Sequence, residues 1–247
     1  MHINTDIKHD LSIYPQYGQH FSFILCHKNF EDKFGDIANK VYITDNKEYA
    51  TNSGAILIDK NDYDSRIYGE LPFWMYISKQ IREQDSAALM AYRRKLYPKI
   101  GIQVAQPLNL PCSVLEQLAY YHSPLISETI CKVLPPEELK ILNGNLLCAY
   151  NIFSAPYKVI VEWLNFVIPR LEQIMKTLGC PNDLKGVKEW VKTTDLLKPY
   201  QGKNNDLDYQ SRIGAFILER LNTIFWLSRN YGQQWQPVTL LEDGQKI

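Results

Sequence analysis

Short apolar segments separated by polar and turn residues dominate the first 105 residues of the chain. A short apolar segment bounded by charged or turn residues is typical of a buried β-strand. Such segments occur at residues 21–26, 41–44, 55–58, 87–92 and 100–104. Between 58 and 87, apolar residues at spacings of three and four predict a helix over 70–83, with Pro72 in its first turn. The alternation of strands and helices predicts an α/β sheet.

The second half of the chain carries mostly helical periodicity. Helices are predicted over residues 113–121, 124–134, 155–178, about 184–197 and 210–229. Pro169 should kink the longest of them, because its ring clashes with the preceding turn. Residues 146–153 are predicted to be an apolar strand or another buried segment, and residues 180–209 a polar loop around the helix near 184–197.

Length and composition indicate a single large domain with short extensions. The chain has 247 residues, of which 45% are hydrophobic, enough to bury a full core. We expect a polar N-terminal extension over residues 1–19, one domain over 20–230 and a loose tail over 231–247. The 27 basic and 27 acidic residues cancel, so composition gives no sign of a nucleic-acid partner.

Cysteine usage and hydropathy bear on the cellular compartment. The five cysteines are scattered and show no metal-ligand spacing, which favours a reduced, cytoplasmic protein. The first 17 residues lack the apolar core of a signal peptide, and no apolar stretch reaches the length of a membrane span. Peripheral contact with the inner face of a membrane is compatible with this composition.

Two adjacent arginines, Arg93 and Arg94, follow the apolar segment at 87–92. Ligands of open α/β sheets bind at the carboxyl ends of the strands. A guanidinium is permanently charged and can form two hydrogen bonds to one oxyanion, so this pair suits a phosphate or a diphosphate. The alternative is that both arginines cap the strand and pair with surface carboxylates.

The helix predicted over 210–229 is apolar almost all round, which predicts that other parts of the protein enclose it. Glu219 and Arg220 interrupt the apolar sequence, and charges in an enclosed helix must be paired or used. Glu219 is therefore either a partner in an internal ion pair or a desolvated general base.

Two Asp-x-Asp spacings occur, one at Asp62 and Asp64 and one at Asp206 and Asp208. Carboxylates one residue apart can hold a divalent cation that bridges a nucleotide diphosphate. The spacing is common by chance, so a metal role for Asp62 and Asp64 is kept as an alternative. The five histidines show no zinc-type pairing.

Several short motifs follow one another in a recognisable order: Cys26-His27-Lys28, Lys60-Asn61, Tyr68-Gly69-Glu70-Leu71, Tyr92-Arg93-Arg94, Tyr150-Asn151-Ile152-Phe153, Glu162-Trp163-Leu164, and Gln210-x-Arg212 with Glu219-Arg220-Leu221. Over about residues 20–230 the chain thereby resembles a bacterial family of capsular and exopolysaccharide glycosyltransferases, long described only as a domain of unknown function. It departs from that family where Gly69 replaces a cysteine, Ala91 a histidine and Lys95 a tyrosine. The order of the motifs, rather than any single one, carries the resemblance.

The resemblance implies a GT-A-like α/β fold with a nucleotide-sugar-binding sheet and a helical C-terminal half. It implies a hexosyltransferase-type enzyme that moves a sugar from a nucleotide-diphosphate donor to a glycan or lipid-linked glycan acceptor. The setting would be capsular, O-antigen or exopolysaccharide synthesis in the cytoplasm.

The resemblance also assigns roles to residues of this chain. The donor diphosphate would be bound by Arg93, Arg94, His27 and Lys28. The acceptor or the sugar would be bound by Tyr92, Tyr150, Asn151 and Arg220. An acceptor hydroxyl must lose a proton, so Glu219 is the first candidate for the catalytic base and Glu70 the second. Because arginines can stabilise the leaving diphosphate, we expect no required cofactor; the alternative is Mg²⁺ or Mn²⁺ at Asp62 and Asp64.

The competing class is a non-catalytic glycosyltransferase-like module that binds nucleotide sugar or glycan, or that scaffolds polysaccharide assembly. The substitutions at Ala91 and Lys95 favour this class. The presence of arginines at 93–94 and of carboxylates at Glu70 and Glu219 opposes it.

Overall fold

The structure is a computed structural model that describes residues 18–26, 34, 37–58, 63–91, 94–96, 101–194, 196 and 205–240. Most of the polar N-terminal extension lies outside the described residues. So do five predicted site residues, namely His27, Lys28, Asp62, Tyr92 and Arg93.

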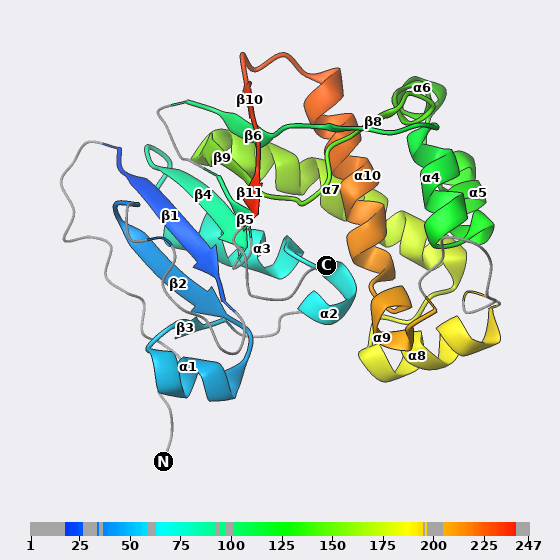
Figure 1. Ribbon diagram of the computed structural model, residues 1–247, viewed down its shortest axis with the longest axis horizontal. Coiled ribbons are helices and arrows are strands. Elements are labelled where there is room, and N and C mark those ends of the chain that lie inside the picture. The colour runs from blue at the N-terminus through cyan, green and yellow to red at the C-terminus, as the bar shows by residue number, and fades with distance from the viewer. Residues whose placement is uncertain are drawn as a thin grey trace.

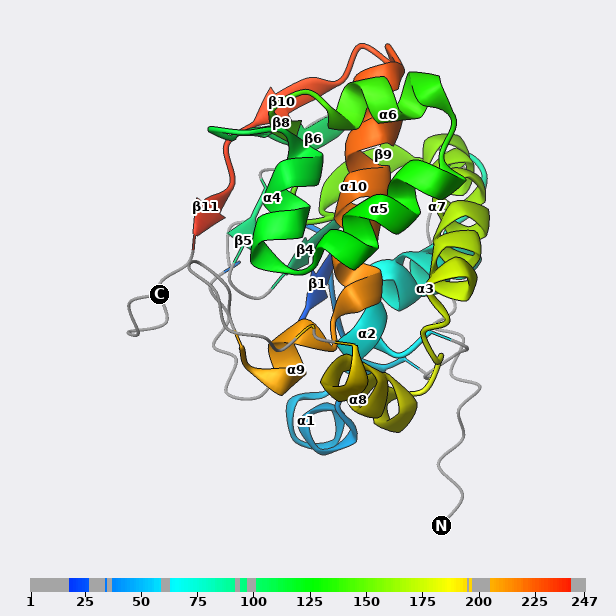
Figure 2. The same cartoon turned by 90° about the vertical axis from the view of Figure 1, so that its right-hand side faces the viewer.

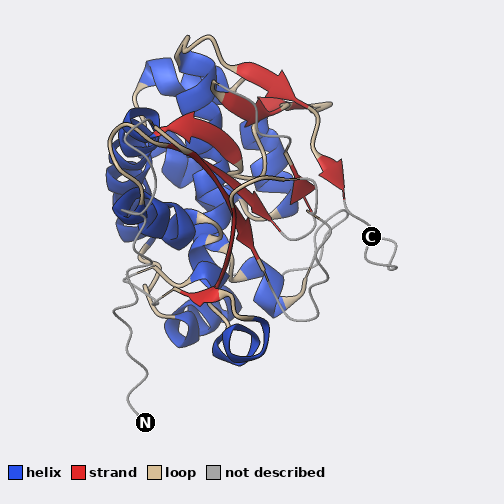
Figure 3. Cartoon of the chain, turned by 90° about the vertical axis from the view of Figure 1, so that its left-hand side faces the viewer, coloured by secondary structure: helices blue, strands red, loops and turns tan. Residues whose placement is uncertain are grey.

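The described residues form a nine-stranded mixed sheet with the strand order β10-β6-β9-β4-β1-β2-β3, while β5 and β11 pair off this path beside β4 (Figure 1). Its strands are β1 His20–Leu25, β2 Lys40–Thr44, β3 Ile56–Leu57, β4 Ser86–Ala91, β5 Arg94–Lys95, β6 Gln103–Ala105, β9 Phe153–Pro156, β10 Gln234–Gln236 and β11 Thr239–Leu240. Figure 3 shows the strands as one curved layer beside the helices.

The first four strands form a continuous parallel block within the sheet. Strand β1 pairs in parallel with β2 on one side and with β4 on the other, and β2 pairs in parallel with β3. All but the first residue of both β1 and β4 are buried, as expected for parallel strands covered on both faces. The carboxyl ends of these strands therefore meet at one edge of the sheet, where ligands of α/β proteins bind.

Ten helices occur among the described residues, namely α1 Lys47–Ser53, α2 Ser65–Tyr68, α3 Leu71–Gln80, α4 Val114–Tyr121, α5 Pro124–Val133, α6 Pro136–Leu142, α7 Tyr157–Leu178, α8 Leu184–Thr193, α9 Leu207–Gln210 and α10 Ile213–Ser228. Helices α4–α6 lie at the opposite side of the molecule from β1–β3 (Figure 1). A small antiparallel sheet of two strands, β7 Leu108–Asn109 and β8 Leu146–Leu147, lies next to them. No described helix combines the length and the apolarity needed to cross a bilayer.

Helix α10 is enclosed as the sequence predicted. It packs against α7, α6 and α2 (Figure 2), and nearly all of its side chains are buried. Asn222 is the polar centre of this packing: its Oδ1 accepts hydrogen bonds from the indoles of Trp163 and Trp226 at 3.0 and 2.9 Å. Its Nδ2 donates to the carbonyl of Cys148 at 3.0 Å. All of its polar groups are thus satisfied inside the core.

Two expectations about elements need correction. The tail is not loose over residues 234–240, because β10 pairs in parallel with β6 and β11 pairs with β5. The segment 146–153 is split between β8 and the start of β9, which runs to Pro156, so α7 begins at Tyr157. Pro169 lies inside α7, and the kink expected there stays a prediction. Polar edge strands such as Gln234–Gln236 lack the apolar pattern that identifies buried ones.

Candidate active site

A cavity of about 950 Å³ opens at the carboxyl ends of β1 and β2. Leu25 ends β1, and Asp45 directly follows β2. The remaining wall comes from the start of α1, from α2 with the turn into α3, and from α8, α9 and the start of α10. The cavity therefore lies where the fold class places ligands.

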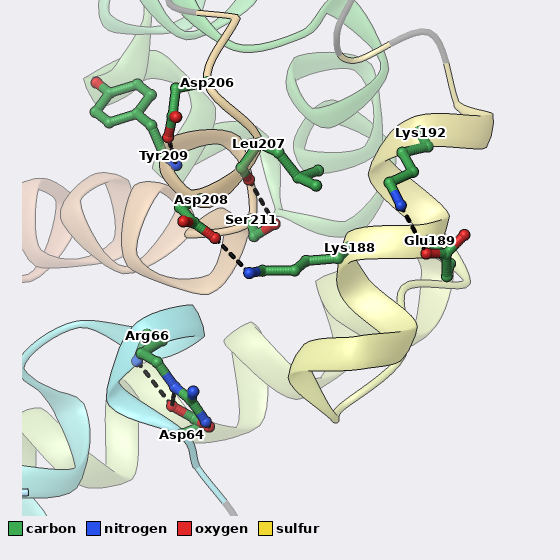
Figure 4. Close-up of polar contacts among 10 residues, drawn as sticks. All are labelled: Asp64, Arg66, Lys188, Glu189, Lys192, Asp206, Leu207, Asp208, Tyr209 and Ser211. Atoms are coloured by element: carbon green, nitrogen blue, oxygen red, sulfur yellow. Dashed lines mark hydrogen bonds and ion pairs between the residues drawn. The ribbon is translucent and has the colours of Figure 1, made fainter.

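Four cations line this cavity, and two of them are already compensated. The guanidinium of Arg66 bonds the carboxylate of Asp64, with Nε 3.0 Å from Oδ1, and Lys188 forms an ion pair with Asp208 (Figure 4). Lys47 and Arg212 are exposed, and neither forms an ion pair with the described residues. These two side chains leave positive charge available to a ligand.

The cavity wall also carries two carboxylates, Asp45 and Glu70. Asp45 accepts a hydrogen bond from the hydroxyl of Ser65, which joins the end of β2 to α2. Glu70 precedes α3 and its side chain is largely buried. Its Oε2 accepts from the amide of Asn151 at 3.2 Å.

Two glycines let α2 and α10 approach closely enough to bring Glu70 near Glu219. Gly69 has a φ of +59°, and a Cβ there would lie 3.0 Å from the Cβ of Ala215. A Cβ on Gly214 would lie 2.4 Å from the ring of Tyr68. Larger residues at either position would force the helices apart.

Two neighbours hold the carboxylate of Glu219. Its Oε2 is 3.1 Å from the guanidinium of Arg220, and its Oε1 is 3.5 Å from the backbone nitrogen of Tyr150. The Arg220 side chain is 1% exposed, whereas that of Glu219 is 25% exposed. The ion pair expected of a structural residue is present, yet the Glu219 side chain is not fully buried.

Burial raises the pKa of Glu219 above its usual value of 4.5, and the nearby Glu70 carboxylate adds to the rise. The positive charges of Arg220 and Arg212 oppose this rise without cancelling it. Burial lowers the pKa of Arg220, which the carboxylate of Glu219 partly restores. A carboxylate with a raised pKa is better suited to accept a proton near neutral pH.

Arg94 joins the same network from the sheet. In β5 it pairs with Ala91, the last residue of β4, so it lies at the carboxyl end of that strand. Its guanidinium carbon is 4.0 Å from the centre of the Tyr150 ring. Tyr150 has a φ of +67°, an uncommon conformation for a residue with a side chain. Strain of this kind is concentrated at functional sites.

The structure brings together every predicted catalytic or binding residue that it describes, in one network of Glu70, Asn151, Tyr150, Glu219, Arg220 and Arg94. Of these, only Glu70 lines the cavity. Sequence reasoning missed Asp45, Lys47 and Lys188 in the wall. Asp45 could have been found from the sequence, because it directly follows the second predicted strand. Arg212 belongs to the Gln210-x-Arg212 motif, but no role was predicted for it.

Three of the four aspartates in the two Asp-x-Asp spacings have other roles in the structure. Asp64 caps α2 by accepting from the backbone nitrogen of Arg66 at 2.9 Å, in addition to the Arg66 ion pair. Asp206 caps α9 at 2.7 Å from the nitrogen of Tyr209, while Asp208 holds Lys188 (Figure 4). No group of three metal-ligating side chains occurs within the described part of the chain. Asp62 lies outside that part, so the metal alternative stays a prediction.

The sheet order and the helices packed beside it define a GT-A-like α/β fold, as the sequence predicted. One solved structure with this arrangement is that of WbbM, a bifunctional glycosyltransferase in its apo form. The TM-score is 0.64 at 14% sequence identity, over 92% of this chain and 46% of the WbbM chain. The chain thus matches about half the length of that protein. No sequence family matches the chain and no curated protein does, so the family resemblance drawn from motifs stays a prediction.

Proposed function

We propose that this chain is a glycosyltransferase that moves a sugar from a nucleotide-diphosphate donor to a glycan acceptor. The observation that carries the proposal is the cavity at the carboxyl ends of β1 and β2, with two cations that form no ion pair within the described part of the chain and a carboxylate that adjoins the Glu219 network. The fold shared with a glycosyltransferase supports the same reaction class.

In this proposal the donor diphosphate lies in the cavity, opposite Lys47 and Arg212. Arg94, with Arg93 and the His27-Lys28 pair, supplies further positive charge at the strand ends. When the bond between the sugar and the donor phosphate breaks, the electron pair leaves with the diphosphate. Fixed cations stabilise the negative charge that develops there.

The acceptor hydroxyl attacks the anomeric carbon of the donor sugar and must give its proton to a base. Glu219 remains the first candidate, because its pKa is raised and its carboxylate is partly exposed. Glu70 is the alternative, because it lines the cavity itself. Tyr92, Tyr150, Asn151 and Arg220 would contact or position the sugar or the acceptor.

The finer biological setting follows from the same proposal. The acceptor would be a glycan or lipid-linked glycan of capsular, O-antigen or exopolysaccharide synthesis, used in the cytoplasm or at the inner face of the membrane. The reaction would need no cofactor, since arginines and a lysine take the place of a metal ion; Mg²⁺ or Mn²⁺ at Asp62 and Asp64 is the competing arrangement.

The test measures release of nucleoside diphosphate from a panel of UDP-, GDP- and dTDP-sugars, with and without EDTA. We expect release from at least one donor, unchanged by the chelator. Activity that EDTA abolishes and Mn²⁺ restores would instead support the metal-dependent alternative.

The same panel separates an enzyme from a binding module. Isothermal titration with UDP, GDP and dTDP would detect a nucleotide that binds without being turned over. Binding without release from any donor would favour a non-catalytic module, and absence of both would contradict the proposal.

A further inference from the structure

A second cavity, of about 570 Å³, lies on the other side of α2. Tyr63 and Tyr68 contribute to it from α2 and the residues before it, and the end of α7 with the following loop completes it. Ser65 and Arg66, on the same short helix, line the first cavity instead. Helix α2 is therefore a wall common to both cavities.

The inner surface of this second cavity is aromatic and apolar. Tyr63 and Tyr68 meet edge to face, with ring centres 5.1 Å apart. Leu171, Met175 and the buried Cys180 complete that surface. Rings and methylene groups of this kind pack against the C–H faces of sugars while their polar tips remain bonded.

The rim carries polar groups held in place by the two tyrosines. The hydroxyl of Tyr63 donates to Oε1 of Glu172, and that of Tyr68 donates to Oδ1 of Asn182 at 3.3 Å. Burial raises the pKa of Tyr68 to about 12, with further contributions from Cys180 and Glu172. Tyr68 therefore stays protonated and keeps donating at physiological pH.

These bonds leave a defined set of polar atoms for a ligand. Oε2 of Glu172, Nδ2 of Asn182 and Nζ of Lys176 have no hydrogen-bond partner among the described residues. They provide one acceptor and two kinds of donor around an apolar surface. Sugar hydroxyls both donate and accept, so they match such a mixed rim. A phosphate would be repelled by Glu172.

We propose that this second cavity is a sugar-binding subsite, which holds a unit of the acceptor glycan away from the reacting end. Tyr63 and Tyr68 form its inner surface, and Glu172, Asn182 and Lys176 bind hydroxyls. As an acceptor subsite it rests on the proposed function, whereas sugar binding at this cavity can be tested alone.

The binding test uses saturation-transfer NMR with lactose, cellobiose, maltose, mannobiose and diacetylchitobiose, at millimolar concentrations typical of weak ligands. We expect at least one disaccharide to bind the unmodified chain. Glu172→Ala and Asn182→Ala should each weaken that binding about tenfold, which corresponds to about 1.4 kcal/mol. Both side chains are exposed, so the fold should survive, as circular dichroism would verify.

Two control variants test whether a loss of disaccharide binding is specific to the second cavity. Glu128→Ala removes an exposed carboxylate from α5 and should leave disaccharide binding unchanged. Arg212→Ala, in the first cavity, should leave it unchanged too. Failure of every disaccharide to bind, or binding that is indifferent to both rim substitutions, would overturn the proposal.

Kinetics then separates this proposal from the proposed function. If both hold, the rim variants raise KM for the acceptor while donor hydrolysis in water stays as it was. If no donor is turned over but disaccharide binding still depends on Glu172, the transferase assignment fails and the sugar site stands.

Discussion

The buried polar groups around Asn222 and Arg220 of α10 and the cavity at the ends of β1 and β2 contain similar polar side chains. The two regions differ in how many of those side chains bond to other protein groups. Around Asn222 and Arg220 the side chains are buried and bonded to protein groups. In the cavity, Lys47 and Arg212 have no oppositely charged partner among the described residues. Buried groups that bond to one another hold the fold in one arrangement, whereas exposed charges without an ion-pair partner are available to bind an anionic ligand.

Glu70 and Glu219 lie at the boundary between these two regions. Glu70 faces the cavity but is bonded to Asn151, and Glu219 is bonded to Arg220 but is partly exposed. Which region each carboxylate serves is the question that substitution can answer most directly.

The largest expected effect is on turnover. Glu219→Gln keeps the volume and removes the basic group, so it should lower kcat about 10²- to 10⁴-fold while donor binding is retained. Donor turnover and nucleotide titration measure the two quantities. Glu70→Gln is the parallel variant, and whichever substitution causes the larger loss identifies the base.

Glu128→Gln, on an exposed face of α5, is the matched control and should behave as the unmodified chain. A Glu219→Gln protein that unfolds readily, yet has normal activity per folded molecule, would assign Glu219 to the fold alone.

The next largest effect is expected on stability, at the buried hydrogen bonds of Asn222. Asn222→Ala leaves two indole N–H groups and one carbonyl buried without partners, which should lower the free energy of unfolding by about 3–5 kcal/mol. Urea denaturation followed by tryptophan fluorescence measures it. Asn143→Ala, at an exposed helix end, should change stability little. Equal losses of stability in both variants would show that the hydrogen bonds of Asn222 stabilise the fold no more than an exposed side chain does.

A smaller effect, on nucleotide binding, is expected at Lys47 and Arg212, the two cavity cations without an ion-pair partner among the described residues. Arg212→Ala and Lys47→Ala should each weaken binding of the nucleotide diphosphate by about 1.5–3 kcal/mol, with little change in unfolding. Arg94→Ala should weaken nucleotide binding by a similar amount if Arg94 reaches the donor. Isothermal titration measures the affinities, with Lys132→Ala on α5 as the control. Unchanged affinity in all three test variants would mean that the donor binds elsewhere.

The smallest effect is a pH dependence. As a base, Glu219 must be deprotonated, so kcat/KM should rise with pH through a pKa that lies above 4.5. Residual activity of Glu219→Gln should lack this acidic limb. A limb that persists in that variant would point to another group.

The same pKa predicts the sign of a stability change. Because the folded state raises the pKa of Glu219, the folded protein holds its proton at pH values where the unfolded chain has lost it. Stability contributed by this group is present below pH 4.5 and is lost as pH rises through the folded pKa. Urea titrations of the unmodified chain and of Glu219→Gln should differ by that slope.

The strands and the enclosed helix were predictable because burial leaves a repeating apolar pattern. The parallel strands, α3, α7 and α10 follow from it, and so does the position of Arg94 at the end of β4. The edge strand β10 and helix α1 were missed because mostly exposed elements carry no such pattern, and α2 was missed because four residues are too few to show a helical period.

The network around Glu219 was predictable residue by residue, since buried charge is conspicuous in an apolar helix. The cavity wall was not, because Lys47, Lys188 and Arg212 come from segments far apart in the chain. Surface lysines and arginines look alike in sequence, and only the packing of α1, α8 and the start of α10 around the strand ends selects these three.

The sheet is also assembled out of chain order. Strand β9 separates β4 from β6, and β6 receives β10 from residues 234–236. During synthesis, the free edge of β4 would wait for β9 at residues 153–156, and that of β6 would wait for β10 at residues 234–236. Sheets closed by such distant segments form slowly and expose pairing edges meanwhile. A chaperone that covers the free edges of β4 and β6 during synthesis would therefore protect the nascent chain from incorrect strand pairing until β9 and β10 are made.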